Sequence, residues 1–313
     1  MKTFYRLVSI AVFCAAMTAI SCGEATTDVN DDGGSIIPSN PSKPEEPDNT
    51  KVRKISKITQ INDNYTRSWT LDYDANERVS KIDCVEGESG DYSKWEYNIR
   101  YYDDELNIFY SDEYDSGYVF ISLNKSGYIA SYAEEWEDDG YAGSYEQTFE
   151  YNLQGYLQEF EDVYYEIDES GEYTSGWGVT YKWSSGNIAS RERYDTEDGE
   201  EDYSERWTMT YNNKKQDVIN LDINAFVEYY SYDIGLEYFD GSCALALGLV
   251  GKTNKNLITK SVGECSDGAI YEITYKWSYD EDGYPIQCTA EGWYTYDSVQ
   301  EDIAYSYEFE YVD

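Results

Sequence analysis

Apolar and polar residues alternate along most of the chain with a period of two. Between residues 271 and 279 the odd positions are Tyr, Ile, Tyr, Trp and Tyr, and the even positions are Glu, Thr, Lys and Ser. This alternation is typical of a β-strand with one buried face and one solvated face. The same pattern recurs near residues 69–73, 95–101, 149–151, 173–183, 207–211 and 303–311. The sequence therefore predicts an all-β domain.

The ends of these segments share one kind of turn. An Asp or Asn follows the last apolar residue, and a Gly often comes three residues later, where a side chain caps the turn and Gly accepts a positive φ. The clearest examples are Tyr73-Asp74, Leu123-Asn124 with Gly127, Tyr151-Asn152 with Gly155, and Tyr279-Asp280 with Gly283. The repeating unit is therefore a hairpin of strand, turn and strand.

Successive turns lie far enough apart for two strands each, which predicts about sixteen antiparallel strands in an up-and-down meander. A sheet of that size must curl, so we expect either a barrel-like closure or a deeply bent open sheet. The rhythm fails over residues 222–262, and the small apolar run CALALGLVG predicts a short irregular or helical insert near 240–255. Hydrophobic closure of one end of the sheet and a gate or lid over a ligand are both roles for such an insert.

The first residues have the layout of a secretory signal. Lys2 and Arg6 precede an apolar run, and small residues lead from it to Cys22. The stretch Ala19-Ile20-Ser21-Cys22 resembles a bacterial lipobox, which implies a signal peptide over 1–21 and acyl chains on Cys22. Residues 22–50 are polar, acidic and rich in Pro, which predicts a disordered tether. Residues 51–313 then form a single repeat-built β domain.

The charge balance restricts the possible partners. The chain has 63 acidic and 23 basic residues, a formal net charge of −40. Nucleic-acid binding depends on Lys and Arg that neutralise phosphates, so we expect no nucleic-acid partner, and membrane contact only through the anchor at Cys22. A basic protein, a cationic ligand or Ca²⁺ would be attracted. An acidic shell also simply keeps a protein with 36 tyrosines soluble.

Several catalytic classes are excluded because the chain has no His and lacks phosphate-loop and nucleophile-elbow motifs. A pair of carboxylates for glycoside hydrolysis cannot be singled out among so many acids. We therefore expect a protein that is not an enzyme and has no cofactor. In the tether, Asp28, Asn30, Asp32 and Gly33 match half of a calcium loop, but Ser39 stands where a bidentate Glu belongs, so the segment is interpreted as a linker without a metal.

Four cysteines follow the lipobox, and in an exported chain they permit two disulfides in three arrangements. They are Cys84, Cys243, Cys265 and Cys288. Cys84 and Cys288 lie in strand-like segments, where free buried thiols are common. If a bond forms, we expect Cys243 with Cys265, since this pair would close the irregular insert.

Two resemblances follow from these motifs. The rhythm of an aromatic residue, Tyr-Asp or Tyr-Asn, and then Gly is similar to the tyrosine–aspartate repeats of Rhs-type shell proteins. The hairpins, NLDIN at 220–224, LALGLVGKTNKNLITKSV at 245–262 and the closing YEITYKW…DGYPI resemble a family of Bacteroidota lipoproteins of unknown function with a porin-like β fold. The second resemblance implies a fold and a place at the outer membrane, facing the cell exterior, but no catalytic residues. Glu, Lys and Thr on the outer face argue against strands that face lipid.

These observations favour a non-catalytic cell-surface lipoprotein that binds a glycan or another extracellular ligand. Tyr and Trp rings stack on sugars, and nearby Asp, Asn and Glu accept hydrogen bonds from hydroxyls. The alternative is a structural or adhesive surface protein that binds a protein partner through its acidic face. Adjacent aromatic residues place one ring on each face of a strand, so we predict ligand contacts at Tyr164 and Tyr165, Tyr229 and Tyr230, and Trp293 and Tyr294.

Overall fold

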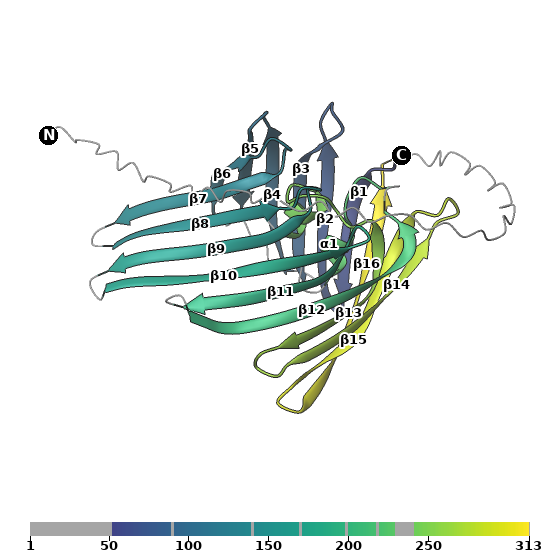
Figure 1. Cartoon of the computed structure of the whole chain (residues 1–313). Coiled ribbons are helices and arrows are strands. Elements are labelled where there is room, and N and C mark those ends of the chain that lie inside the picture. The colour runs from purple at the N-terminus through teal and green to yellow at the C-terminus, as the bar shows by residue number, and fades with distance from the viewer. Residues whose placement is uncertain are drawn as a thin grey trace, which may run out of the picture. The chain divides into compact units, whose positions relative to one another are not determined.

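The structure is a computed structural model that describes residues 52–88, 91–138, 141–168, 171–197, 200–216, 219–228 and 241–312. Sixteen antiparallel strands form one sheet that closes into a barrel (Figure 1). Each strand pairs with its neighbours in sequence, and the last strand pairs with the first. This confirms the predicted meander and shows that the sheet is closed. The predicted signal sequence, Cys22, the predicted tether and its half calcium loop lie outside the described residues.

The strands of the first half are β1 (Ile55–Asn62), β2 (Tyr65–Tyr73), β3 (Val79–Glu88), β4 (Asp91–Tyr101), β5 (Glu105–Asp112), β6 (Ser116–Leu123), β7 (Ile129–Asp138) and β8 (Tyr141–Tyr151). The second half has β9 (Leu157–Asp168), β10 (Gly171–Ser184), β11 (Asn187–Glu197), β12 (Glu200–Lys215), β13 (Asn256–Cys265), β14 (Ile270–Tyr279), β15 (Pro285–Tyr296) and β16 (Val299–Tyr311). Between β12 and β13 lie two short helices, α1 (Asn224–Val227) and α2 (Gly241–Ala246).

The predicted turn chemistry is present in the structure. Asp280 Oδ1 accepts hydrogen bonds from the N–H groups of Asp282 at 3.1 Å and Tyr284 at 2.8 Å, and Gly283 has a φ of 90°. Equivalent bonds to a side-chain oxygen occur at Asp74, Asn124 and Asn152. The Asp or Asn side chain therefore holds each turn closed, as the sequence indicated.

Six hairpins carry a further contact, which we call the hairpin-closing bond. An aromatic residue near the end of the second strand donates a hydrogen bond to a main-chain carbonyl near the start of the first strand. The bonds run from Tyr73 to Ile55 (2.5 Å), Tyr101 to Val79 (3.0 Å), Tyr151 to Ile129 (2.7 Å), Trp183 to Leu157 (2.7 Å), Trp277 to Ile258 (2.7 Å) and Tyr311 to Pro285 (2.7 Å). In the β5–β6 hairpin the second strand ends at Leu123, whose side chain has no donor.

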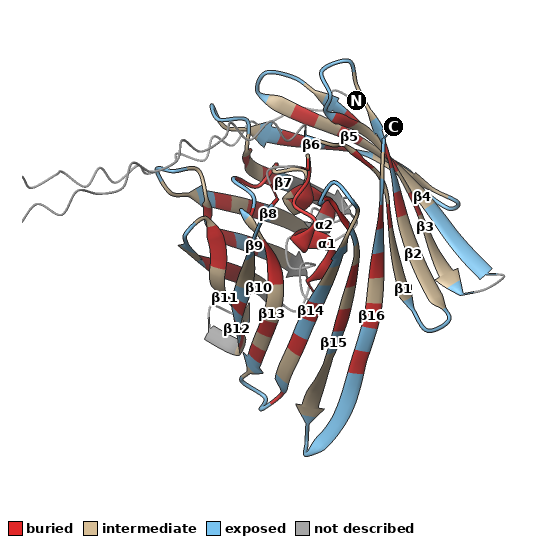
Figure 2. Cartoon of the chain, turned by 90° about the vertical axis from the view of Figure 1, so that its right-hand side faces the viewer, coloured by how far each residue is buried: buried red, intermediate tan, exposed pale blue. Residues whose placement is uncertain are grey.

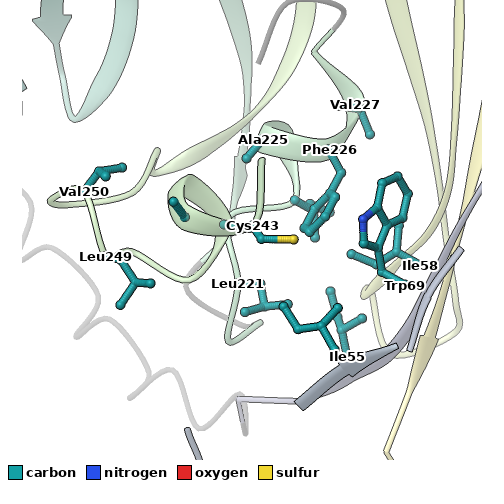
Figure 3. Close-up of a cluster of buried hydrophobic side chains, with 14 of the residues drawn as sticks. Ile55, Ile58, Trp69, Leu221, Ala225, Phe226, Val227, Cys243, Leu249 and Val250 are labelled. Atoms are coloured by element: carbon teal, nitrogen blue, oxygen red, sulfur yellow. The ribbon is translucent and has the colours of Figure 1, made fainter. Parts of the chain in front are cut away.

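The insert between β12 and β13 lies inside the ring of strands, where it covers their inward apolar side chains (Figure 2). Phe226 of α1 meets Trp69 of β2 edge to face with 5.1 Å between ring centroids (Figure 3). Cys243 of α2 and the inward Ile55 and Ile58 of β1 belong to the same core. The insert therefore closes the core, as predicted for residues 240–255, although α1 begins earlier than that range.

A buried carboxylate fixes the insert to the chain around it. Asp222 accepts hydrogen bonds from the side-chain amide of Gln216 (3.0 Å), the backbone N–H of Asn224 (3.1 Å) and both the backbone and the side-chain N–H of Asn254 (2.7 and 2.9 Å). Burial raises the pKa of Asp222. The adjoining cavity has a volume of about 20 Å³, enough for about one water molecule. This network is therefore structural.

The expected Cys243–Cys265 disulfide is wrong in this structure. Cys84, Cys243, Cys265 and Cys288 are all free thiols. Cys243 is buried in the core with α2, whereas the Cys265 thiol at the end of β13 lies 3.8 Å from a Glu205 carboxylate oxygen. The insert is held by apolar packing and by the Asp222 network, so it needs no covalent closure.

Candidate binding site on the outer face

The outer face of the barrel is mostly polar. On β14 the inward Ile273 and Tyr275 are buried, while the alternating Thr274 and Lys276 are exposed. Figure 2 shows the same alternation of buried and exposed positions along the strands. Against this background, a cluster of large apolar side chains on the outside stands out from the general pattern.

Such a cluster lies on β5 and β6. Tyr118 and Phe120 are 65% and 58% exposed, whereas the alternating Val119 and Ile121 point inward and are fully buried. The Tyr118 ring lies 4.8 Å from the Phe109 ring and 6.2 Å from the Phe120 ring, centroid to centroid. The Tyr118 and Phe120 rings are nearly parallel, with 18° between their planes. Together these three rings form a platform that faces solvent.

An open pocket of about 480 Å³ lies beside this platform. Its lining comes from four consecutive strands and consists of Ser80, Asn98, Ile99, Arg100, Asn107, Phe109, Tyr118 and Phe120. The cross-strand register explains the convergence, since Phe109 lies opposite both Asn98 of β4 and Tyr118 of β6, and Asn107 lies opposite Phe120. Residues far apart in the sequence thus meet because they share one face of adjacent strands.

The polar groups of this pocket are available to a ligand. Asn107 Oδ1 is buried and has no hydrogen-bond partner among the described residues. Arg100 is exposed and forms no ion pair within the described part of the chain. Asn98 donates to Glu96 at 2.9 Å, which fixes its amide. A buried acceptor without a partner costs free energy, and a ligand hydroxyl would remove that cost.

A second open pocket, of about 590 Å³, continues along the same strands. Tyr92, Lys94 and Glu96 of β4 line it, and on β4 they directly precede Asn98 and Arg100 of the first pocket. Hydrogen bonds from Lys81 and Asn98 lower the pKa of Glu96, so this carboxylate is ionised near neutral pH. The two pockets therefore follow β4 as adjacent parts of one surface.

The inner face holds carboxylates, but they are already engaged. Asp162 accepts hydrogen bonds from Tyr145 at 2.6 Å and Gln147 at 2.9 Å, and burial raises its pKa. Within the described residues no group of three or more Cys, Asp or Glu is placed to hold a metal ion. In the same part of the chain, no helix is both long and apolar enough to cross a membrane.

The described residues among the predicted adjacent aromatic pairs lie on two separate strands. On β15, Trp293 lies on the outer face and Tyr294 points inward, where its ring stacks on Tyr271 at 5.5 Å. On β9, the Tyr164 hydroxyl donates to Glu166, and Tyr165 is half-buried. Tyr229 and Tyr230 lie outside the described residues. The pairs thus divide between the two faces as alternation requires, on strands that are not neighbours.

Sequence reasoning missed Phe109, Tyr118 and Phe120. A signal was present, because Tyr118 to Ile121 form a run of four apolar residues within one strand, whereas most of the strands alternate. A strand with apolar residues on both faces either is covered on both sides or exposes one of them. The structure shows that this strand exposes its outer face.

The fold and the site together define a sixteen-stranded antiparallel barrel that is closed inside by its own insert and carries an aromatic pocket outside. Two solved structures have a similar fold. A porin-like protein from Bacteroides uniformis ATCC 8492 is 17% identical over 82% of this chain and 98% of its own, with a TM-score of 0.55. A porin-like protein from Bacteroides vulgatus ATCC 8482 is 15% identical over 83% and 99%, with a TM-score of 0.56. No protein-family model and no curated protein matches the chain.

Proposed function

We propose that this protein is a non-catalytic cell-surface lipoprotein that binds a glycan in the outer pocket between β3 and β6. The observation that carries the proposal is the solvent-facing platform of Phe109, Tyr118 and Phe120 beside the unpartnered Asn107 carbonyl oxygen. Rings of this kind stack on the C–H faces of sugars. Asn107 would accept a hydrogen bond from a sugar hydroxyl, and Arg100 would donate one.

A lipid anchor at Cys22 would place this pocket outside the cell, at the outer membrane. The exposed Thr274 and Lys276 of β14 support a barrel that is not embedded in lipid, because polar side chains on a lipid-facing surface are destabilising. A Cys22→Ala variant should lose both incorporation of labelled fatty acid and sedimentation with membranes. Unchanged labelling in this variant would remove the anchor from the proposal.

Binding of the full-length chain to a panel of soluble polysaccharides tests the site. For any polysaccharide that binds, Phe120→Ala should weaken the affinity about three- to tenfold, the effect of losing one stacked ring. Tyr114→Ala is the matched control, since Tyr114 is 91% exposed in the turn of the same hairpin and does not line the pocket.

Trp293→Ala separates this pocket from the site predicted on β15. Loss of binding in Trp293→Ala but not in Phe120→Ala would move the site to β15. If no polysaccharide binds, the glycan proposal fails and the adhesive alternative, a protein partner on the acidic surface, takes its place.

A further inference from the structure

The strongest irregularity of the barrel is the junction between β6 and β7. Only two residue pairs join these strands, Ser122 with Ser131 and Leu123 with Ile129. On either side, β5 and β6 share seven pairs, and β7 and β8 share eight. In Figure 1, β7 to β10 run across the view while β3 and β5 run up it, so the sheet changes direction at this junction.

The register shows which backbone groups of β6 are left without a partner. The Asp112 N–H donates to the Asp115 carbonyl at 2.9 Å, so these two residues form a hydrogen-bonded pair at the turn. In an antiparallel ladder such pairs occur at every second residue. Gly117, Val119 and Ile121 therefore bond to β5, and the N–H and C=O groups of Tyr118 and Phe120 point the other way. Neither residue has a partner on β7 within the described register.

This edge lacks the features that usually protect an open strand. Natural edge strands carry Pro, Lys, a bulge or an inward charge that prevents another strand from pairing. Between Ser116 and Ile121 the chain reads SGYVFI, with no Pro and no charge, and its pairing with β5 is regular. An unprotected edge with exposed rings is a template for strand addition.

The charged residues near the β6 edge determine which kind of strand can pair with it. Asp112, Glu113 and Asp115 lie in the β5–β6 turn, and β7 has the sequence IASYAEEWED. Hydrogen bonds from the Tyr110 hydroxyl and from the backbone N–H groups of Tyr114 and Asp115 lower the pKa of Asp112, so it is ionised near neutral pH. A second copy of this chain, with a formal charge of −40, would be repelled, whereas a cationic segment would be attracted.

We propose that the edge of β6 at Tyr118 and Phe120 binds an extended segment of a basic protein as an added strand, with Lys or Arg alternating with apolar residues. The partner backbone would bond to the free groups of Tyr118 and Phe120, and its charges would face the acidic turn. The binding uses main-chain groups of β6 rather than the ring faces beside the pocket, so it does not rest on the proposed glycan site.

Hydrogen exchange with a probe peptide tests the proposal. The purified full-length chain is mixed with an eight-residue peptide of alternating Lys and Val, and with a Glu-Val peptide as the control. The Lys-Val peptide should slow exchange at the amides of Tyr118 and Phe120 and leave Leu106 and Ile108 of β5 unchanged. The Glu-Val peptide should leave all four amides unchanged.

One variant of the protein and one modified peptide test whether the β6 edge is responsible for peptide binding. Phe120→Pro removes an N–H that has no partner among the described residues, and Pro is tolerated at such an edge position. It should weaken peptide binding at least about tenfold, while the exchange of Ile108 confirms that the barrel is intact. If this variant does not fold, a Lys-Val peptide with N-methylated amides on one edge should fail to bind the unaltered chain. Peptide binding that survives both changes, or that leaves Tyr118 and Phe120 exchange unaffected, overturns the proposal.

Discussion

Two junctions between strands of the barrel differ: the one where its first and last strands meet, and the one between β6 and β7. The first and last strands meet through six residue pairs between β1 and β16, with Ile58 opposite Phe309 and both side chains buried. Tyr311 adds a hairpin-closing bond to Pro285 beside this junction. At the junction of β6 and β7 there are two pairs, and the β5–β6 hairpin ends in Leu123 instead of an aromatic donor. The junction with the fewest described residue pairs is therefore in the middle of the barrel and not where its first and last strands meet.

The comparison shows where the series of hairpin-closing bonds is interrupted. Tyr151 closes the β7–β8 hairpin, and yet the ladder on the β6 side of that hairpin has only two pairs. Where Leu replaces the aromatic donor, the next ladder stops after two pairs and a strand edge is left open. Loss of one donor in a repeat thus coincides with the surface on which both proposed binding activities lie.

Replacing a Phe with Ala at each of the two junctions should give the largest difference in the free energy of unfolding. Phe309→Ala removes a ring that is buried in β16 and stacked on Trp277 at 5.9 Å, so the free energy of unfolding should fall by about 3–5 kcal/mol. Phe120→Ala removes an exposed ring and should change it by less than about 0.5 kcal/mol. Urea denaturation of both variants measures the difference. Equal losses would show that the β6 edge is packed as tightly as the closing junction.

A smaller effect is expected from the hairpin-closing bonds. Tyr311→Phe removes the hydroxyl that donates to the Pro285 carbonyl and should cost about 1 kcal/mol of unfolding free energy. Tyr118→Phe at the open edge removes a hydroxyl from an exposed side chain and should cost nothing measurable. If the two variants unfold at the same urea concentration as the unaltered chain, these bonds do not contribute to stability.

Alkaline pH should lower the stability of the chain through the tyrosines of the hairpin-closing bonds. Burial raises the pKa of Tyr73 and of Tyr101 to about 12, from about 10 in the unfolded chain. Between pH 10 and 12 the unfolded state loses these protons first, so stability should fall as pH rises through that window. Tyr101→Phe should make the fall less steep, as measured by urea denaturation at several pH values. An unchanged slope in Tyr101→Phe would mean that Tyr101 titrates alike in both states.

Much of the architecture could be predicted because its signals are local. Alternation within each strand and the Asp or Asn of each turn depend on a few neighbouring residues, and the structure confirms both. Closure could only be expected as one of two outcomes, because Ile58 alternates in the same way whether or not Phe309 lies opposite it. The wrong Cys243–Cys265 pairing had the same origin, since closeness of those thiols depends on how the insert packs inside the barrel.

The candidate site was less predictable than the fold. Whether a ring is exposed depends on the strand beside it, and the sequence does not show that Tyr271 covers Tyr294 while Tyr118 and Phe120 remain open. The convergence of Asn98, Asn107 and Phe109 depends on the register between β4 and β5. The four-residue apolar run at Tyr118 was the local sign of this surface.

The pairing of β1 with β16 also sets the order in which the chain can be completed. Because Ile55 lies opposite Tyr311, the outer edge of the first strand cannot pair with β16 until the chain has been synthesised as far as residue 311. The insert that covers Trp69 likewise emerges only after β12. Contacts between such distant segments make folding slow, and an unfinished chain exposes its apolar inner face meanwhile. Loss of β16 would therefore leave the barrel open at both β1 and β15.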